Sequence, residues 1–144
     1  MSDATPIPAI PTFEVTPTTV QLFEFSAITW NPHRIHFDAP YARDVEGYDD
    51  VLVHGPLLGA WLMRLAETWS SGWGQVASMT YRSTVALPVG RRVRITGAVT
   101  GVTDSTVAAD TWVEREDLTR VCHGQVTIAR RRASDGPGDS TRPG

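Results

Sequence analysis

Residues 55–72, GPLLGAWLMRLAETWSSG, decide the fold because they predict one long apolar helix with clear ends. Leucine, tryptophan and alanine recur at three- and four-residue spacing from Leu57 to Trp69, as on a helix face. Pro56 is favoured in a first helical turn, and Gly72 lies just past the last one. Because the apolar residues cover more than one side, we expect a sheet to wrap around this helix.

The chain after this helix changes to a pattern typical of strands. Four segments carry β-branched residues in alternation: residues 76–87, 91–102, 106–115 and 120–130. The three separators between them are short enough for antiparallel hairpins. A long helix followed by four consecutive strands indicates an α+β fold in which an antiparallel sheet curls around a central helix.

The chain before the helix is less regular. Residues 1–18 contain four prolines and are expected to form an extended arm. Residues 19–27 alternate partly between apolar and polar side chains, which we interpret as a first strand. Asp38 is the expected N-cap of a short helix that ends near Gly47, because a proline follows in its first turn.

Length, charge and cysteine content limit the function classes. A chain of 144 residues fits one domain, which we place at residues 19–132, with a disordered tail at residues 133–144. The net charge of −3 and the pI near 5.7 give no basic field for nucleic acid. The single cysteine and the lack of a secretion signal or long apolar run favour a cytoplasmic protein without membrane association. The five tryptophans supply apolar surface for a second subunit.

Residues 31–38, NPHRIHFD, concentrate polar side chains in a short segment. They include two histidines, an arginine, an asparagine and an aspartate. His54 and Gly55 stand at the start of the long helix, where backbone N–H groups lack intrahelical partners. Since imidazole titrates near neutrality, the cluster suggests acid–base catalysis on a polarised carbonyl.

Three motifs carry a resemblance to a known family. They are FSAITWNPHRIHFD at residues 25–38, PYA at residues 40–42 and VHGPLL at residues 53–58, with a looser match at Tyr81, Arg82, Pro88 and Gly90. Over about residues 20–131 the chain resembles MaoC-like hydratases and dehydratases of the hotdog fold. It is similar above all to the branch of mitochondrial 3-hydroxyacyl-thioester dehydratases and mesaconyl-CoA hydratases.

The resemblance implies a homodimer with sites between the subunits, and a substrate carried as a thioester on coenzyme A or an acyl carrier protein, with no further cofactor. Such enzymes add or remove water across the α,β bond. Their catalytic histidine corresponds to His36, and their amide donor at the helix start to Gly55. The aspartate that assists the histidine corresponds to Asn31, which cannot accept a proton at neutral pH. The related branch also has asparagine there, with a histidine at the position of His33.

On this basis we expect His36 to exchange a proton with the α-carbon or with water, while Asn31 holds the water or the β-hydroxyl. The Gly55 N–H would stabilise the enolate. His33 and His54 are further candidates for substrate binding. No metal site is assigned, although two imidazoles and the Asp38 carboxylate are possible ligands; Asp38 fits a helix N-cap better.

Each of these residues also has a structural interpretation. His36 could be a hydrogen-bonded core histidine, Asn31 a turn residue, and His54 a residue bonded to a loop carbonyl. Cys122 and His123 are neighbours on an expected strand, so their side chains should point to opposite faces and form no nucleophilic pair.

Three other functions stay open on the same fold. The first is a polyketide-type tailoring enzyme that dehydrates, cyclises or isomerises a bulkier biosynthetic intermediate. The second is a noncatalytic acyl-binding or assembly subunit, which would bind without turnover. The third is a thioesterase, which is weaker because no carboxylate is well placed near Gly55 to activate water.

Overall fold

The structure is a computed structural model that describes residues 6–131, so the expected tail at residues 133–144 lies outside the described part. The elements are β1 (Phe13–Val15), α1 (Thr19–Ile28), a 3-10 helix (Arg34–His36), α2 (Ala39–Asp44), α3 (Gly55–Ser70), β2 (Gly74–Ser83), β3 (Val93–Val102), β4 (Thr106–Arg115) and β5 (Arg120–Arg130). The strands form one antiparallel sheet in the order β1-β3-β4-β5-β2. The predicted α+β class is confirmed.

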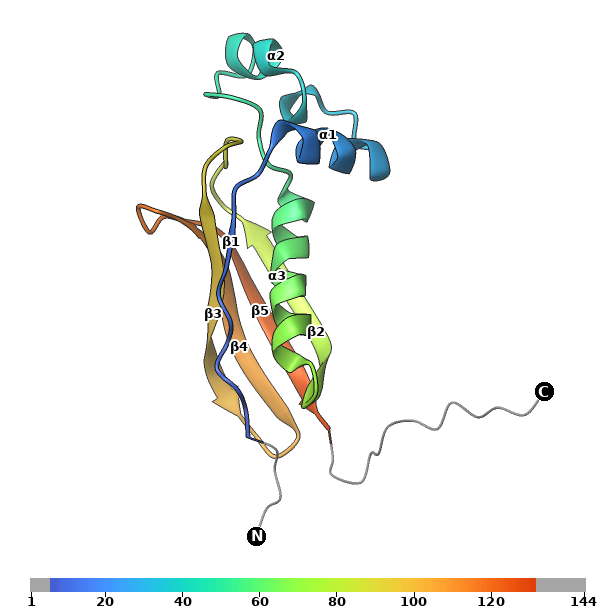
Figure 1. Cartoon of the computed structure of the whole chain (residues 1–144), viewed down its shortest axis with the longest axis vertical. Helices are drawn as coiled ribbons and strands as arrows, with labels where there is room; N and C mark the ends of the chain where they lie inside the picture. The colour runs from blue at the N-terminus through green and yellow to red at the C-terminus, as the bar shows by residue number, and fades with distance from the viewer. Residues whose placement is uncertain (1–5, 132–144) are drawn as a thin grey trace, which may run out of the picture.

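Helix α3 packs along one face of the sheet and contacts β2, β3, β4 and β5 (Figure 1). Its central leucines, Leu58, Leu62 and Leu65, are fully buried. Burying each of them contributes on the order of 1.5–3 kcal/mol to folding. The prediction of a central helix inside a curled sheet is therefore confirmed.

One predicted hairpin is wrong. Residues 103–105 connect β3 to β4 and residues 116–118 connect β4 to β5 as antiparallel neighbours, as expected. Strand β2 instead pairs with β5, from Gly74 opposite Arg130 to Ser83 opposite Cys122. Residues 88–90 therefore form no hairpin turn; they lie in the connection from β2, at one edge of the sheet, to β3, near the opposite edge. Strand pairing depends here on contacts distant in sequence, which the length of a separator does not reveal.

The predicted first strand at residues 19–27 is also wrong, since these residues form α1. The Thr18 side chain caps this helix by accepting a hydrogen bond from the backbone N–H of Gln21 at 3.2 Å. Apolar side chains lie on several sides of α1, so its pattern matches neither a half-buried strand nor an amphipathic helix. Leu22 and Ser26, one turn apart, are its buried residues.

The extended arm belongs to the sheet. Strand β1 pairs with β3, with Phe13 opposite Ile95. Further along the arm, the Trp69 indole N–H donates a hydrogen bond to the carbonyl of Pro8 at 2.8 Å. The packed domain consequently begins before residue 19.

The short helix α2 begins as predicted. Asp38 is its N-cap, and its carboxylate accepts a hydrogen bond from the backbone N–H of Tyr41 at 3.1 Å. Helices α1 and α2 lie together at the end of the sheet where α3 begins (Figure 1). Across residues 6–131, no helix has both the length and the apolar character that crossing a membrane requires.

The cysteine prediction is confirmed on β5. Cys122 is fully buried while its neighbour His123 is exposed, so the two side chains face opposite sides of the sheet. Burial raises the pKa of the Cys122 thiol to about 11. The thiol is therefore an inert part of the core.

Gly124 on β5 offers a test of the packing between helix and sheet. A Cβ at this position would lie 2.6 Å from the Thr111 hydroxyl and 2.9 Å from a methyl of Leu62. We expect Gly124→Ala to lower the free energy of unfolding by about 1–3 kcal/mol, because the helix must shift outward. Gly101→Ala is the matched control, since the nearest atom to its added Cβ is 3.9 Å away. Urea unfolding followed by tryptophan fluorescence measures both, and equal effects of the two changes would contradict the packing.

Candidate active site

The residues before α3 gather the candidate side chains at the end of the sheet. Asn31 follows α1, His33 caps the 3-10 helix, and His36 is the last residue of that helix. The Asn31 side-chain oxygen accepts a hydrogen bond from the His33 backbone N–H at 3.1 Å. This local bond fixes the turn and leaves the side-chain NH₂ of Asn31 as its available polar group.

His36 has the geometry of a general base. Its Nδ1 lies 2.7 Å from the carbonyl oxygen of Leu52, and the side chain is 8% exposed. Because a carbonyl oxygen only accepts hydrogen bonds, Nδ1 carries the proton, and the neutral ring has its lone pair on Nε2. Burial lowers the pKa of His36 most strongly, the Leu52 bond opposes this, and the nearby His33 lowers it further. The ring is therefore neutral and able to accept a proton at neutral pH.

His54 is the N-cap residue of α3 and has no exposed surface. Its ring stacks on that of His36, with the centroids 3.7 Å apart and the planes 18° from parallel. Its Nε2 lies 2.8 Å from the hydroxyl oxygen of Ser26, whereas its buried Nδ1 has no hydrogen-bond partner in the described residues. Burial, and next the proximity of His36, lower the pKa of His54 to about 4. Two neutral imidazoles can stack in this way, whereas two imidazolium ions would repel each other.

Gly55 places an N–H group at the start of α3. The first intrahelical bonds run from the N–H groups of Leu57 and Leu58 to the carbonyl of His54, at 3.0 and 3.1 Å. Pro56 has no N–H, and the Gly55 N–H donates no hydrogen bond within residues 6–131. It is thus available to an oxyanion, and the positive end of the helix dipole favours negative charge at this point.

An apolar pocket of about 380 Å³ lies beside these residues. It is lined by Phe23, Ser26, Ala27, Trp30, Asn31, Pro32 and Phe37. Asn31 is the one predicted site residue among them. His33, His36, His54 and Gly55 do not line the pocket, although His54 contacts its wall through Ser26. Ser26 and the aromatic residues of the pocket lining were not predicted from the sequence. Their place in the pocket depends on α1 being a helix, whereas the sequence analysis expects a strand there.

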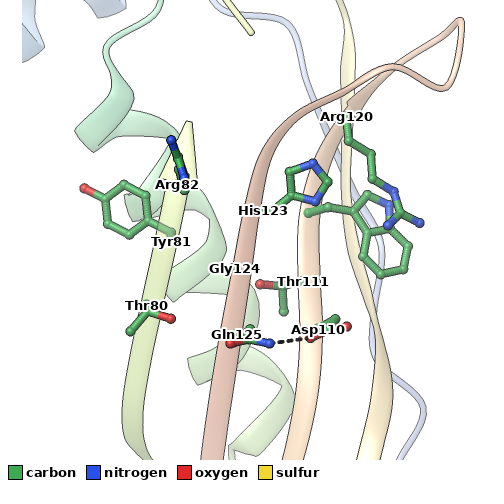
Figure 2. A pocket seen from close by; sticks show the side chains of 10 residues that line it. Thr80, Tyr81, Arg82, Asp110, Thr111, Arg120, His123, Gly124 and Gln125 are labelled. Carbon is green, nitrogen blue, oxygen red and sulfur yellow. Dashed lines mark hydrogen bonds between the residues drawn. The ribbon is translucent and has the colours of Figure 1, made fainter. Parts of the chain in front are cut away.

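A second hollow of about 470 Å³ lies over strands β2, β4 and β5 (Figure 2). Its lining includes Tyr81 and Arg82 from the looser part of the family resemblance. The Gln125 amide donates a hydrogen bond to Asp110 at 3.4 Å there, and the Arg120 guanidinium lies 3.9 Å from the centre of the Trp112 ring. None of the five predicted site residues lines this hollow.

The remaining polar residues of the segment are engaged with one another. The Arg34 guanidinium forms an ion pair with Asp38 at 2.7 Å, and this bond is the main reason that the pKa of Asp38 is lowered. Within the described part of the chain, no group of three or more His, Cys, Asp or Glu side chains is arranged to hold a metal ion.

The buried His54 makes stability depend on pH. Its pKa is 6.5 in the unfolded chain and about 4 in the folded protein. Between these two pH values the unfolded chain therefore binds a proton that the folded chain does not bind. The free energy of unfolding should therefore be highest above pH 6.5 and should fall by up to about 3 kcal/mol as the pH drops to 4. Denaturant titrations across this range measure the slope. In His54→Gln, whose side chain at this position cannot titrate, the slope should shrink to the part due to His36 and, near pH 4, to carboxylates with a lowered pKa such as Asp38. Parallel curves for the two proteins would contradict the assignment.

Sequence comparisons identify related proteins. Residues 2–90 match the hydroxyacyl-thioester dehydratase type 2 family. Mesaconyl-C(4)-CoA hydratase of Chloroflexus aurantiacus is 45% identical over 73 residues, which are 51% of this chain and 25% of that protein. Mitochondrial hydroxyacyl-thioester dehydratase type 2 of Saccharomyces cerevisiae is 46% identical over 41 residues, which are 28% of this chain and 15% of that protein. The matched part thus spans a quarter or less of these relatives.

Solved structures match over most of the chain. One protein of the ChsH1–ChsH2 complex from Mycobacterium tuberculosis is 17% identical, with a TM-score of 0.76 over 86% of this chain and 96% of that one. The (R)-hydratase from A. caviae is 16% identical, with a TM-score of 0.75 over 87% of this chain and 98% of that one. At such identities the likeness concerns the fold alone, and it confirms the hotdog class. Because the family match covers more than half of the residues, the chain belongs to the hydroxyacyl-thioester dehydratase type 2 family.

Proposed function

We propose that this protein is a hydro-lyase that adds or removes water across the α,β bond of an acyl thioester, carried by coenzyme A or an acyl carrier protein. The observation that carries the proposal is the pairing of His36 with the start of α3. The Leu52 carbonyl holds His36 with a basic Nε2, and the unengaged N–H of Gly55 can donate a hydrogen bond to the developing oxyanion. The names of the sequence relatives, a CoA hydratase and a hydroxyacyl-thioester dehydratase, support the same reaction class.

In the dehydration direction, Nε2 of His36 removes the proton from the α-carbon. The electron pair of that C–H bond moves toward the thioester carbonyl, whose oxygen is stabilised by the Gly55 N–H. The C–O bond at the β-carbon then breaks, the α,β double bond forms, and the departing hydroxide takes the proton from His36 to leave as water. Hydration is the reverse sequence, so one imidazole serves both proton transfers.

Asn31 fits a binding role in this reaction. Its side-chain oxygen is engaged by the His33 N–H, so the side chain offers its NH₂ group to the pocket. An NH₂ group donates to the oxygen at the β-carbon but cannot remove a proton. The basic role consequently rests with His36 alone.

Substitution of His36 tests the reaction. Purified protein is incubated with a panel of enoyl and 3-hydroxyacyl thioesters of coenzyme A, and the addition or loss of water is followed by mass. We expect turnover by the wild type and a 10²- to 10⁴-fold lower kcat in His36→Ala. His123→Ala is the matched control, because His123 is exposed on β5.

Equal rates for wild type and His36→Ala would exclude the assigned base. Binding of thioesters without turnover by the wild type would favour a noncatalytic subunit instead. That alternative has support from one structural relative, which is part of a complex of two different proteins.

We also propose that the protein forms a homodimer through β2. This strand is ten residues long and lies at the edge of the sheet, so its outer side can accept another strand. Much of it, including Ala77, Ser78 and Thr80, is exposed. Pairing of two copies of β2 would remove both edges from solvent.

Light scattering after size-exclusion chromatography tests the dimer. We expect about twice the chain mass of 15.8 kDa for the wild type. Ser78→Asp places like charges near the middle of the paired strands and should shift the protein toward monomer. Ser105→Asp makes the same chemical change in an exposed hairpin and should leave the mass unchanged. A monomeric wild type, or a Ser78→Asp variant that stays dimeric, would refute the β2 interface.

A further inference from the structure

We propose that the Ser26 hydroxyl binds substrate by donating a hydrogen bond to the oxygen at the β-carbon, and that buried His54 holds it in the donating orientation. The inference rests on the proposed function and specifies how its site distinguishes a 3-hydroxyacyl group from a saturated one. Ser26 is thereby assigned as a binding residue. His54, expected above to contact the substrate, is assigned as a positioning residue.

The surroundings of His54 determine which of its ring nitrogens carries the proton. The ring is fully buried and neutral at pH 7, so it has one N–H group and one bare nitrogen. Its Nδ1 has no partner in the described residues, and its Nε2 lies 2.8 Å from the Ser26 hydroxyl oxygen. A buried N–H without a partner is costly, so the proton belongs on Nε2, which donates to Ser26.

The Ser26 hydroxyl hydrogen needs an acceptor other than His54. Since Ser26 accepts a hydrogen bond from His54, it cannot donate back along the same line. Nor does the hydroxyl bond to a carbonyl one turn earlier, as the nearby Thr29 does to Phe25 at 2.6 Å. In the part of the chain that is described, its hydrogen-bond partner is His54. The side chain is 7% exposed and lines the apolar pocket, so its O–H group can be satisfied by a molecule in that pocket.

The pocket lining indicates the chemistry of the ligand that fits it. Its walls are mainly aromatic and aliphatic, and its polar side chains are Ser26 and Asn31. These two lie close together, because the Asn31 backbone N–H donates to the Ser26 carbonyl at 2.9 Å. Two adjacent donors in an apolar pocket suit a ligand that has one oxygen on a hydrocarbon chain. A 3-hydroxyacyl group has this form.

Binding of two probes tests the donor role without requiring turnover. The dissociation constants of 3-hydroxybutyryl-CoA, as both enantiomers, and of butyryl-CoA are measured by calorimetry. We expect the wild type to prefer one hydroxylated enantiomer, and Ser26→Ala to bind it about 10-fold more weakly while binding butyryl-CoA unchanged. Ser70→Ala is the matched control, because Ser70 is buried at the far end of α3.

A wild type without preference for either hydroxylated probe would overturn the inference, as would equal losses for all probes in Ser26→Ala. The nitrogen-15 NMR signals of His54 give an independent measurement. We expect the form protonated on Nε2 at pH 7, and the form protonated on Nδ1 would overturn the inference. Intact binding discrimination with no turnover would refute the hydro-lyase and leave the Ser26 assignment standing, so the two failures are distinguishable.

Discussion

The burial of α3 against the curved sheet is the constraint on which the rest of the structure depends. Its leucines fill the concave face, and Trp69 and Trp73 pack edge to face at its far end, with ring centroids 5.1 Å apart. Because an α-helix is rigid over its 16 residues, these contacts also fix the position of its first turn. The orientation of the Gly55 N–H is therefore set by apolar contacts several turns away from it.

At the end of the sheet where α3 begins, burial keeps two histidines neutral. Burial and the closeness of the stacked rings keep His54 neutral, and burial outweighs the opposing Leu52 bond at His36. Neutrality costs little in the fold and leaves one imidazole free to accept a proton at physiological pH. A carboxylate at position 31 would place a negative charge next to His33, whose ring lies 5.9 Å from that of His36, whereas asparagine does not. Asparagine at this position is thus consistent with a site built from neutral groups.

Patterns that depend on neighbours in sequence were predictable. The apolar stripe of α3, the strands β4 and β5 and the Asp38 cap all follow from local spacing and side-chain chemistry. The form of α1 could not be predicted from its apolar residues, because the deciding feature is the Thr18 cap. The pairing of β2 with β5 brings together residues that are 39 to 56 positions apart, which no local pattern encodes.

The site shows the same division. His36 and Gly55 were candidates from the sequence motifs, and the structure brings them to one end of the sheet, where His36 stacks on the residue before Gly55. Ser26 was not identified, since a serine in an apolar segment has no distinctive pattern. Its significance depends on the burial of His54, a residue 28 positions later in the chain. Hydrogen-bond direction is a property of the folded network and not of either residue alone.

The buried thiol of Cys122 has a practical consequence for spectroscopy. With its pKa raised to about 11, only about one thiol in ten thousand is ionised at pH 7, and the side chain has no exposed surface. Maleimide dyes and thiol-reactive nitroxide labels should thus not react with the native chain. A cysteine introduced at a chosen exposed position would be the sole attachment point, so fluorescence or spin-label distances can be measured without first removing a core residue.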